Sequence, residues 1–206
     1  IPNISKINLE YADMLDMSSL IRVLQLCQPD EIYNLAAQSD VRISFDQPIY
    51  TTQTIAIGTL NLLEAIRLTC QETKMYQASS SEMFGNNIDD DGFQRETTPM
   101  SPVSPYGCAK VYAYNICRNY RNAYDMFISN GVLFNHESPR RGTNFVTNKV
   151  AKEAVKIKLG LSNELKLGNL NASRDWGHAK DYVKTMWLML QQDSPDDFIC
   201  STGVSH

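Results

Sequence analysis

The chain has 206 residues, of which 43% are hydrophobic and 20% are charged, a balance typical of a folded protein with an apolar core. Its formal net charge of -4 argues against a protein that binds nucleic acid or an anionic membrane surface through overall charge. The apolar runs are too short to span a bilayer, and no signal peptide is visible. The five scattered cysteines lack the spacing of a zinc site, so we expect no metal and reduced, mostly buried thiols in the cytoplasm.

The first half of the chain alternates predicted strands and helices. Residues 31–37 predict a short buried strand, residues 48–68 carry apolar side chains at helical spacing, and residues 74–78 predict a second strand. Residues 85–104 are rich in Asn, Asp, Gly, Pro and Thr, which predicts a long loop. We interpret the acidic run at 89–91 as a solvated loop tip rather than a metal site.

The second half begins with a helix whose start is clearly marked. Ser104 is a good N-cap and Pro105 suits the first helical position, and the helical pattern continues to about Tyr124. The remaining predicted elements are a strand over 126–134, helices over 145–159 and 181–190, and a short strand over 198–200.

Strands that alternate with helices predict an α/β fold, here a Rossmann-like doubly wound parallel sheet with helices on both faces. Polar residues follow the three main predicted strands, at 38–39, 80–82 and 135–138. Ligands of such sheets bind at the carboxyl ends of the strands. We therefore expect these three polar segments to lie on one rim and to form a shared active-site cleft.

A dinucleotide-binding fold needs a glycine-rich turn after its first strand to admit the pyrophosphate, and this sequence has no such turn. Residues 7–13 resemble a strand from the middle of such a sheet rather than its first strand. We therefore expect that the sequence lacks the opening strand–turn–helix of the domain, or else that the fold differs.

Tyr106 and Lys110 lie one helical turn apart on the same face of the helix that Ser104 begins. An ammonium next to a phenol favours the phenolate, which can act as a base on a sugar hydroxyl, and the lysine can also hold a cofactor ribose. The spacing alone is a weak signal. The serines and Glu82 at the end of the preceding strand strengthen it.

Several longer stretches resemble a known family. They lie at residues 34–39, 76–85, 104–106, 133–142 and 174–183. Together with the Tyr106–Lys110 pair they resemble the GDP-mannose 4,6-dehydratases, in the extended branch of the short-chain dehydrogenase/reductase superfamily. The resemblance covers nearly the whole chain, and its last two stretches are long and specific.

The resemblance implies dehydration of GDP-mannose to its 4-keto-6-deoxy form, with NADP as cofactor. Tyr106 would take the proton of the 4-hydroxyl while hydride leaves carbon 4 for NADP. Glu82 would remove the proton on carbon 5 and help to expel water from carbon 6, to which the hydride then returns. Ser80 would hydrogen-bond the oxygen at carbon 4, and Lys110 would assist Tyr106 and hold the cofactor.

The resemblance also implies binding residues, domains and partners. The cofactor would be bound by Asp13, Met14, Leu35, Ala36, Ala37, Gln38, Ser39, Tyr50, Lys110, His136 and Arg141. The GDP-sugar would be bound by Ser80, Glu82, Tyr106, Asn135, Val146, Lys149 and Arg174. Residues 1–140 would form a partial dinucleotide-binding domain, and residues 141–206 part of a smaller substrate-binding region interleaved with the end of the Rossmann sheet. The expected partners are GDP-mannose and further copies of the chain, in a homodimer or homotetramer, with no nucleic acid and no membrane.

Two positions depart from the family pattern. Position 80 is usually threonine, and Ser80 keeps the hydroxyl. Position 40 is usually histidine, so Asp40 either faces solvent or places an anion beside the presumed cofactor cleft, where it would weaken NADP binding or alter the hydride transfer.

Two other functions stay open. One is a related nucleotide-sugar enzyme, such as an epimerase or a dTDP-glucose 4,6-dehydratase. Epimerases of the superfamily lack a glutamate at position 82, and dTDP-glucose dehydratases usually carry Asp-Glu where this chain has Ser81-Glu82. The other is a non-catalytic binding protein, which would be expected to have lost Tyr106, Lys110 or Glu82.

Overall fold

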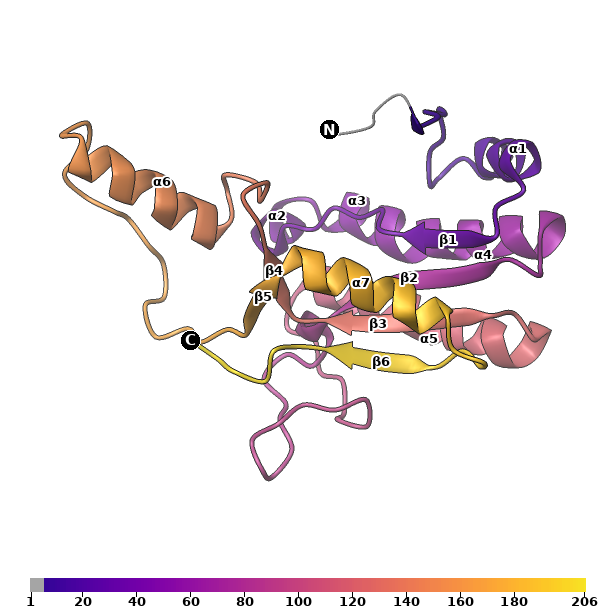
Figure 1. The fold of residues 1–206 in the computed structure, drawn as a ribbon. Coiled ribbons are helices and arrows are strands. Elements are labelled where there is room, and N and C mark those ends of the chain that lie inside the picture. Colours follow the sequence, from indigo (N-terminus) through magenta and orange to yellow (C-terminus); the bar gives the residue numbers. More distant parts are fainter. Residues whose placement is uncertain (1–5) are drawn as a thin grey trace. The chain divides into compact units, whose positions relative to one another are not determined.

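The structure is a computed structural model that describes residues 6–206 (Figure 1). The chain forms two compact units. The first comprises the residues up to Val132 together with Met186–Ile199, and the second comprises Leu133–Thr185 together with Cys200–His206. The candidate catalytic residues therefore all belong to the first unit.

The first unit is built on a sheet whose strands are in the order β1-β2-β3-β6. These strands are β1 (Glu31–Asn34), β2 (Lys74–Ser80), β3 (Ile128–Leu133) and β6 (Asp197–Cys200). β1 and β2 run parallel, with Asn34 opposite Gln77. All six residues of β3 are buried, as expected for a strand that is covered on both faces.

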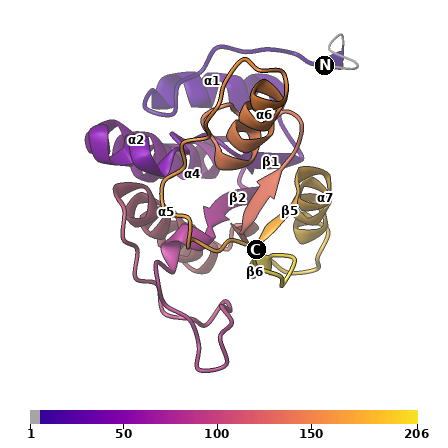
Figure 2. The same cartoon turned by 90° about the vertical axis from the view of Figure 1, so that its left-hand side faces the viewer.

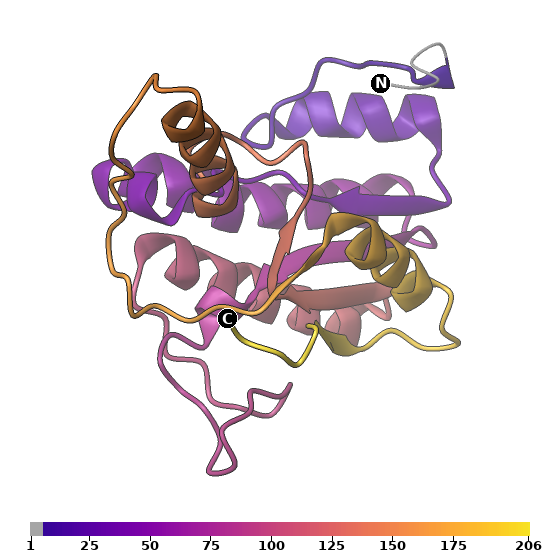
Figure 3. The same ribbon diagram turned by 60° about the vertical axis from the view of Figure 1, so that its left-hand side comes forward.

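Helices cover both faces of this sheet, as Figures 2 and 3 show. α4 (Gly58–Thr69) and α5 (Pro105–Tyr124) lie on one face, and α1 (Met17–Cys27) packs against α4. Their apolar side chains share one core with Met75 of β2 and Ile128 of β3. The last turns of α7 (Ala179–Leu190), which belong to the first unit, cover the other face. The predicted doubly wound fold is confirmed.

The helix predicted over 48–68 is continuous in the chain but not uniform. It consists of α3 (Pro48–Thr52), a π-helical segment η2 (Gln53–Ile57) and then α4. The wider π turn carries one extra residue, a form of helix that often occurs near functional sites. Ile55 and Ala56 of this segment pack against α5.

A short helix, α2 (Val41–Asp46), precedes α3 and explains the conformation of Asp40. The Asp40 carboxylate is the N-cap of α2 and accepts hydrogen bonds from the backbone N–H groups of Arg42 (2.9 Å) and Ile43 (3.2 Å). The anion is thus turned toward the positive end of its own helix.

Two expectations from the sequence are wrong. Residues 7–13 do not form a strand, because a strand exists only through pairing and no segment of the described chain pairs with these residues. The cysteines are free but are not mostly buried, since Cys27 and Cys108 are exposed and Cys70 is half-buried. Small side chains at helix ends and outward-facing helix positions do not need to enter the core.

The segment 85–104 forms the long loop that the sequence predicts. Its acidic tip is tied down by Arg95, whose guanidinium contacts Asp89 (2.9 Å) and Asp91 (2.5 Å). The base of the loop is closed by Asn87, whose Nδ2 donates to the carbonyl of Pro99 at 3.0 Å.

The second unit contains a small parallel sheet of β4 (Asn135–Glu137) and β5 (Trp176–His178), and the helix α6 (Val146–Lys158). The polar segment at 135–138 was expected to be a strand end beside the other two. The segment does follow β3 closely, but residues 135–137 also form a strand of their own, which the sequence did not predict and which pairs in a separate sheet. Within residues 6–206, none of the helices combines the length and the hydropathy needed to cross a bilayer.

Candidate active site

The first turns of α5 carry the predicted Tyr–Lys pair on the buried side of the helix. The hydroxyl of Ser104 caps the helix by accepting a hydrogen bond from the N–H of Gly107 at 3.0 Å, as the sequence predicts. Tyr106 is 8% exposed and Lys110 is 4% exposed. The ring of Tyr106 packs with Ile55 of the π-helical segment, so the phenol is oriented by apolar contacts.

Lys110 is held by the end of β2. Its Nζ donates to the carbonyl oxygen of Ala78 at 2.7 Å and lies 5.7 Å from the centroid of the Tyr106 ring. Burial lowers the pKa of Lys110 to about 8, because removal from water disfavours the charged ammonium. The lysine is therefore still mainly protonated at neutral pH and is fixed next to the phenol.

Ser80 and Glu82 follow directly at the carboxyl end of β2. The chain turns there into a short helical segment, η3 (Ser81–Met83), for which Ser80 is the N-cap. The Ser80 hydroxyl oxygen accepts from the N–H of Glu82 at 3.2 Å, which leaves its hydrogen to donate. Met83 and Phe84 are fully buried and anchor this turn.

Gly107 allows the turn and the helix to approach closely. A Cβ at this position would lie 2.9 Å from the carbonyl oxygen of Glu82 and 2.9 Å from Cβ of Pro102, which is too close for a side chain. The backbone of Glu82 thus packs directly against the residue that follows Tyr106. The turn that carries Ser80 and Glu82 therefore lies against the start of α5, the helix that carries Tyr106 and Lys110.

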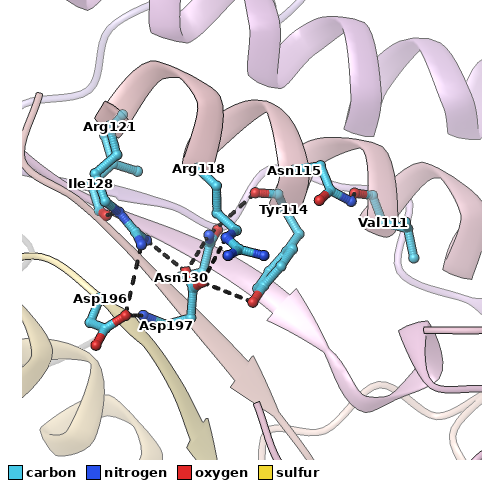
Figure 4. A network of polar contacts seen from close by, with 9 residues as sticks. All are labelled: Val111, Tyr114, Asn115, Arg118, Arg121, Ile128, Asn130, Asp196 and Asp197. Atoms are coloured by element: carbon cyan, nitrogen blue, oxygen red, sulfur yellow. Dashed lines mark hydrogen bonds and ion pairs between the residues drawn. The ribbon is translucent and has the colours of Figure 1, made fainter. Parts of the chain in front are cut away.

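The far half of α5 is fixed by a network of polar contacts around Asp197, shown in Figure 4. The carboxylate of Asp197 is 8% exposed and accepts from the Tyr114 hydroxyl (2.9 Å), from Nη2 of Arg121 (2.6 Å) and from Nδ2 of Asn130 (2.8 Å). Arg118 adds a contact at 3.2 Å. Because α5, β3 and β6 all contribute, the network ties the far half of α5 to the sheet.

The predicted cofactor segment 35–39 leaves the carboxyl end of β1. Leu35 is 59% exposed, and Ala36 and Ser39 are also exposed, whereas Ala37 is half-buried and packs against the core near α5. Gln38 is held within the chain. Its Oε1 accepts from the N–H of Asp40 at 2.6 Å, and its Nε2 donates to the Asp40 carbonyl and to the Thr51 hydroxyl.

The other predicted cofactor residues of the first unit lie on separate elements. Asp13 and Met14 form the turn before α1, where the carbonyl of Met14 accepts from Nδ2 of Asn61 on α4 at 2.9 Å. The Asp13 carboxylate accepts from the N–H of Leu15 at 2.8 Å. Tyr50 on α3 is 53% exposed.

In the second unit, His136 and Arg141 already have partners. The ring of His136 stacks on Tyr182 with centroids 4.8 Å apart, and its Nδ1 lies 2.9 Å from the carbonyl of Phe134. Arg141 pairs with Glu137 at 3.1 Å and lies over the ring of Phe145, 3.5 Å from its centroid. Neither side chain is free to move without giving up these contacts.

The predicted substrate residues of the second unit are spread over three segments. Asn135 is on β4, Val146 and Lys149 are on one face of α6, and Arg174 precedes β5. The Arg174 backbone pairs with His206 through two hydrogen bonds of 2.9 Å. A cavity of about 400 Å³ between α6 and the β4–β5 sheet is lined by other residues, among them Glu137, Ser138, Thr147, Asn148 and His178.

Sequence reasoning missed a buried pair of amides next to the site. Asn34, the last residue of β1, lies opposite Gln77 in the middle of β2, and they are 5% and 2% exposed. A signal was present, because each amide directly follows two large apolar residues, Ile32-Tyr33 before Asn34 and Met75-Tyr76 before Gln77. Gly107 was also missed, and it could be found only from the packing around it.

The fold and the site together define a class. A doubly wound parallel sheet, a serine at the end of a strand, and a Tyr–Lys pair on the following long helix are typical of the extended short-chain dehydrogenases/reductases. The structure of RMD from Pseudomonas aeruginosa complexed with NADPH has this fold, with a TM-score of 0.89 and 26% identity over 96% of this chain and 68% of that chain.

The sequence matches the family described as GDP-mannose 4,6 dehydratase over residues 2–206, and the chain belongs to that family. It is 55% identical over 200 residues to a GDP-mannose 4,6-dehydratase from Vibrio cholerae, covering 96% of this chain and 53% of the relative. It is also 55% identical to one from Yersinia enterocolitica, covering 95% of this chain and 52% of the relative. The chain thus spans about half the length of these curated relatives.

Proposed function

We propose that the protein dehydrates GDP-mannose to GDP-4-keto-6-deoxymannose with NADP as cofactor. The observation that carries the proposal is the close packing of the Glu82 turn on Gly107, which places a carboxylate segment next to a buried Tyr–Lys pair. The reaction needs two separate proton transfers, at the 4-hydroxyl and at carbon 5, and these two groups can perform them separately.

Tyr106 accepts the proton of the 4-hydroxyl as carbon 4 is oxidised. Lys110 stabilises the phenolate form, since its Nζ lies 5.7 Å from the Tyr106 ring and is fixed by the carbonyl of Ala78. Tyr106 belongs to the same buried apolar cluster as Ile55, which supports a fixed orientation of its phenol toward the sugar.

Glu82 then removes the proton on carbon 5, which the neighbouring ketone has made acidic, and returns a proton to the hydroxyl that leaves carbon 6 as water. Ser80 donates its hydroxyl hydrogen to the oxygen on carbon 4, where negative charge develops. This direction of donation agrees with the bond that Ser80 accepts from the N–H of Glu82.

The residues at the carboxyl ends of β1 and β2 leave room and a free hydroxyl for part of a dinucleotide. The hydroxyl of Ser79, at the carboxyl end of β2, is buried and has no hydrogen-bond partner within the described chain. The small exposed side chain of Ala36 permits close approach of a flat ring or a ribose to the end of β1. Residues 35–39, Asp13, Met14, Tyr50 and Lys110 would hold the cofactor, and the family resemblance assigns His136 and Arg141 to it as well. NADP, when bound, would accept a hydride from the sugar and give it back.

The division of labour between the two parts of the chain is also a proposal. Residues 1–140 would bind the dinucleotide. Residues 141–206 would contribute to the binding of the GDP-sugar through Val146, Lys149 and Arg174, and Asn135 of the first segment would contribute as well. The charge of Lys149 and Arg174 suits a diphosphate. Free cysteine thiols support a cytoplasmic location, and the apolar side chains exposed on α2 and α3 support a homodimer or homotetramer, which sedimentation would test.

The activity is tested by incubating the complete protein with GDP-mannose and NADP and measuring the mass of the sugar nucleotide. Loss of one water supports the dehydratase. An unchanged mass with an altered sugar configuration would identify an epimerase instead, and an unchanged substrate would identify a binding protein.

The role of Glu82 is tested by Glu82→Gln, which keeps the shape of the side chain but removes its basicity. Water loss should be abolished while NADP still binds, because the cofactor residues are untouched. Equal loss of both would refute the assigned role.

A further inference from the structure

We propose that Asn34 is a positioning residue that, together with Gln77, sets the conformation of segment 35–39 and thereby the affinity for the dinucleotide. The inference rests on the proposed function, because it takes segment 35–39 as part of the cofactor site. Neither amide is among the residues that the family resemblance assigns to the site.

The two amides form a bonded pair across neighbouring strands. Nδ2 of Asn34 donates to Oε1 of Gln77 at 2.8 Å, and the two residues are partners in the parallel register of β1 and β2. Both side chains are almost fully buried. A buried amide is costly unless it is hydrogen-bonded, so each of the two depends on the other.

A third element holds the Asn34 side chain in place. Its Nδ2 also lies 3.4 Å from the hydroxyl of Thr59 on α4, and this hydroxyl donates to the carbonyl of Ile55 in the π-helical segment at 2.6 Å. Thr59 is 1% exposed. The rotamer of Asn34 is therefore fixed from both sides, by β2 and by α4.

The oxygen of the Asn34 amide contacts the backbone of segment 35–39. Oδ1 of Asn34 accepts from the backbone N–H of Ala36 at 3.3 Å. Leu35 and Ala36 are exposed, so packing does little to hold them. The hydrogen bond from Asn34 is thus the contact that directs the chain as it leaves β1, before Gln38 fixes the segment again through Asp40.

The pair also reaches the carbonyl that holds Lys110. Nε2 of Gln77 lies 3.4 Å from the carbonyl oxygen of Ala78, which accepts the bond from Nζ of Lys110 at 2.7 Å. One buried network therefore connects segment 35–39 with the lysine of the candidate active site. Loss of the hydrogen bond between the two amides would therefore affect both segment 35–39 and Lys110.

The test measures NADPH binding by fluorescence and thermal unfolding of the complete protein, for Asn34→Leu, Gln77→Met and the double variant. Both replacements approximate the shape of the original side chain. Asn34→Leu should raise the Kd for NADPH about tenfold, as expected for the loss of a positioning hydrogen bond, and should lower Tm because Oε1 of Gln77 loses its donor. In the double variant no amide is left unpaired, so Tm should largely recover. The Kd should stay about tenfold raised, because the N–H of Ala36 still lacks its acceptor.

Two further variants sharpen the result. Asn34→Asp keeps an acceptor for Ala36, and Gln77 can turn its amide to donate to the carboxylate, so its Kd should stay within about threefold of the wild type. Asn130→Leu removes an equally buried amide whose contacts are with Asp197 and Tyr114, and it should lower Tm without changing the Kd.

The outcomes separate the inference from the proposed function. If the wild type does not bind NADPH, the proposed function fails and the inference fails with it. If the wild type binds NADPH and the Asn34 variants bind equally well, or if the double variant recovers Kd together with Tm, only the inference is refuted. Should Asn34→Leu alone fail to fold, the double variant and Asn34→Asp carry the same comparison.

Discussion

Replacing Gly107 by alanine should lower turnover far more than it lowers stability. The new Cβ would lie 2.9 Å from the Glu82 carbonyl oxygen and 2.9 Å from Cβ of Pro102, whereas unstrained carbon contacts lie at about 3.5–4.0 Å. The turn at Glu82 or the start of α5 must therefore move by roughly 0.5 Å or more. Overpacking of this kind costs about 1–3 kcal/mol, and alanine regains about 1 kcal/mol of helix propensity over glycine.

The expected net loss is thus about 0–2 kcal/mol, which leaves the protein folded. Turnover is more sensitive, because a misplacement of about 1 Å between reacting groups can cost on the order of a hundredfold in rate. A shift of half that size should lower kcat about tenfold. Circular dichroism on heating gives the stability, and the rate of water loss from GDP-mannose gives kcat. Gly168→Ala is the matched control, because nothing lies within 4 Å of a Cβ at that position. If Gly107→Ala keeps kcat within about twofold of the wild type, the close contact does not position Glu82.

Three further predictions concern charges and caps. The pKa of Lys110 is lowered from 10.5 to about 8 by burial, so below pH 8 the protonated lysine costs the folded state about 3 kcal/mol. Between pH 8 and 10.5 the unfolded state binds more protons at Lys110 than the folded state does, so the stability of the wild type rises with pH in this window. The variant Lys110→Met avoids the cost at every pH. Its gain in stability over the wild type, measured by denaturant titration, should therefore shrink between pH 8 and 10.5. Asp197→Asn should lower the free energy of unfolding by about 3 kcal/mol, because it leaves the Arg121 guanidinium without its buried carboxylate, whereas Asp46→Asn in the exposed pair with Arg42 should change it by less than about 1 kcal/mol. Asp40→Ala should lower the free energy of unfolding by about 1 kcal/mol, because α2 loses its N-cap, whereas Asp40→Asn keeps the cap. A large gain of NADP affinity in Asp40→Asn would show instead that the Asp40 charge acts on the cofactor.

The sequence predicted those elements whose signals are local. Ser104 and Pro105 mark the start of α5 because a cap and a fixed proline φ act within one turn, and the structure has the predicted boundaries of that helix. β2 was predicted from a buried run with a polar end. The proximity of Tyr106 and Lys110 followed from helix geometry alone, and the distance of Lys110 to the ring agrees with it.

The features that the sequence did not predict depend on distant partners. Residues 7–13 have the composition of a strand, but no strand of the described chain pairs with them. β4 and β5 are each three residues long, too short for a periodic pattern, and exist because they pair with one another. The acceptor of Lys110 is a backbone carbonyl, which every residue has, so no sequence pattern could single out Ala78.

The loop over 85–104 separates Glu82 from Tyr106 along the chain, yet its two ends are fastened to one another. A Cβ on Gly85, which has a φ of +60°, would meet the carbonyl of Ser101 at 2.0 Å, and Asn87 bonds to Pro99. The number of residues in the tip therefore has little influence on the spacing of the carboxylate and the phenol. We expect that a short peptide tag or a fluorophore inserted at Gly92, where a Cβ would meet nothing within 4 Å, would report on the site from outside without altering it.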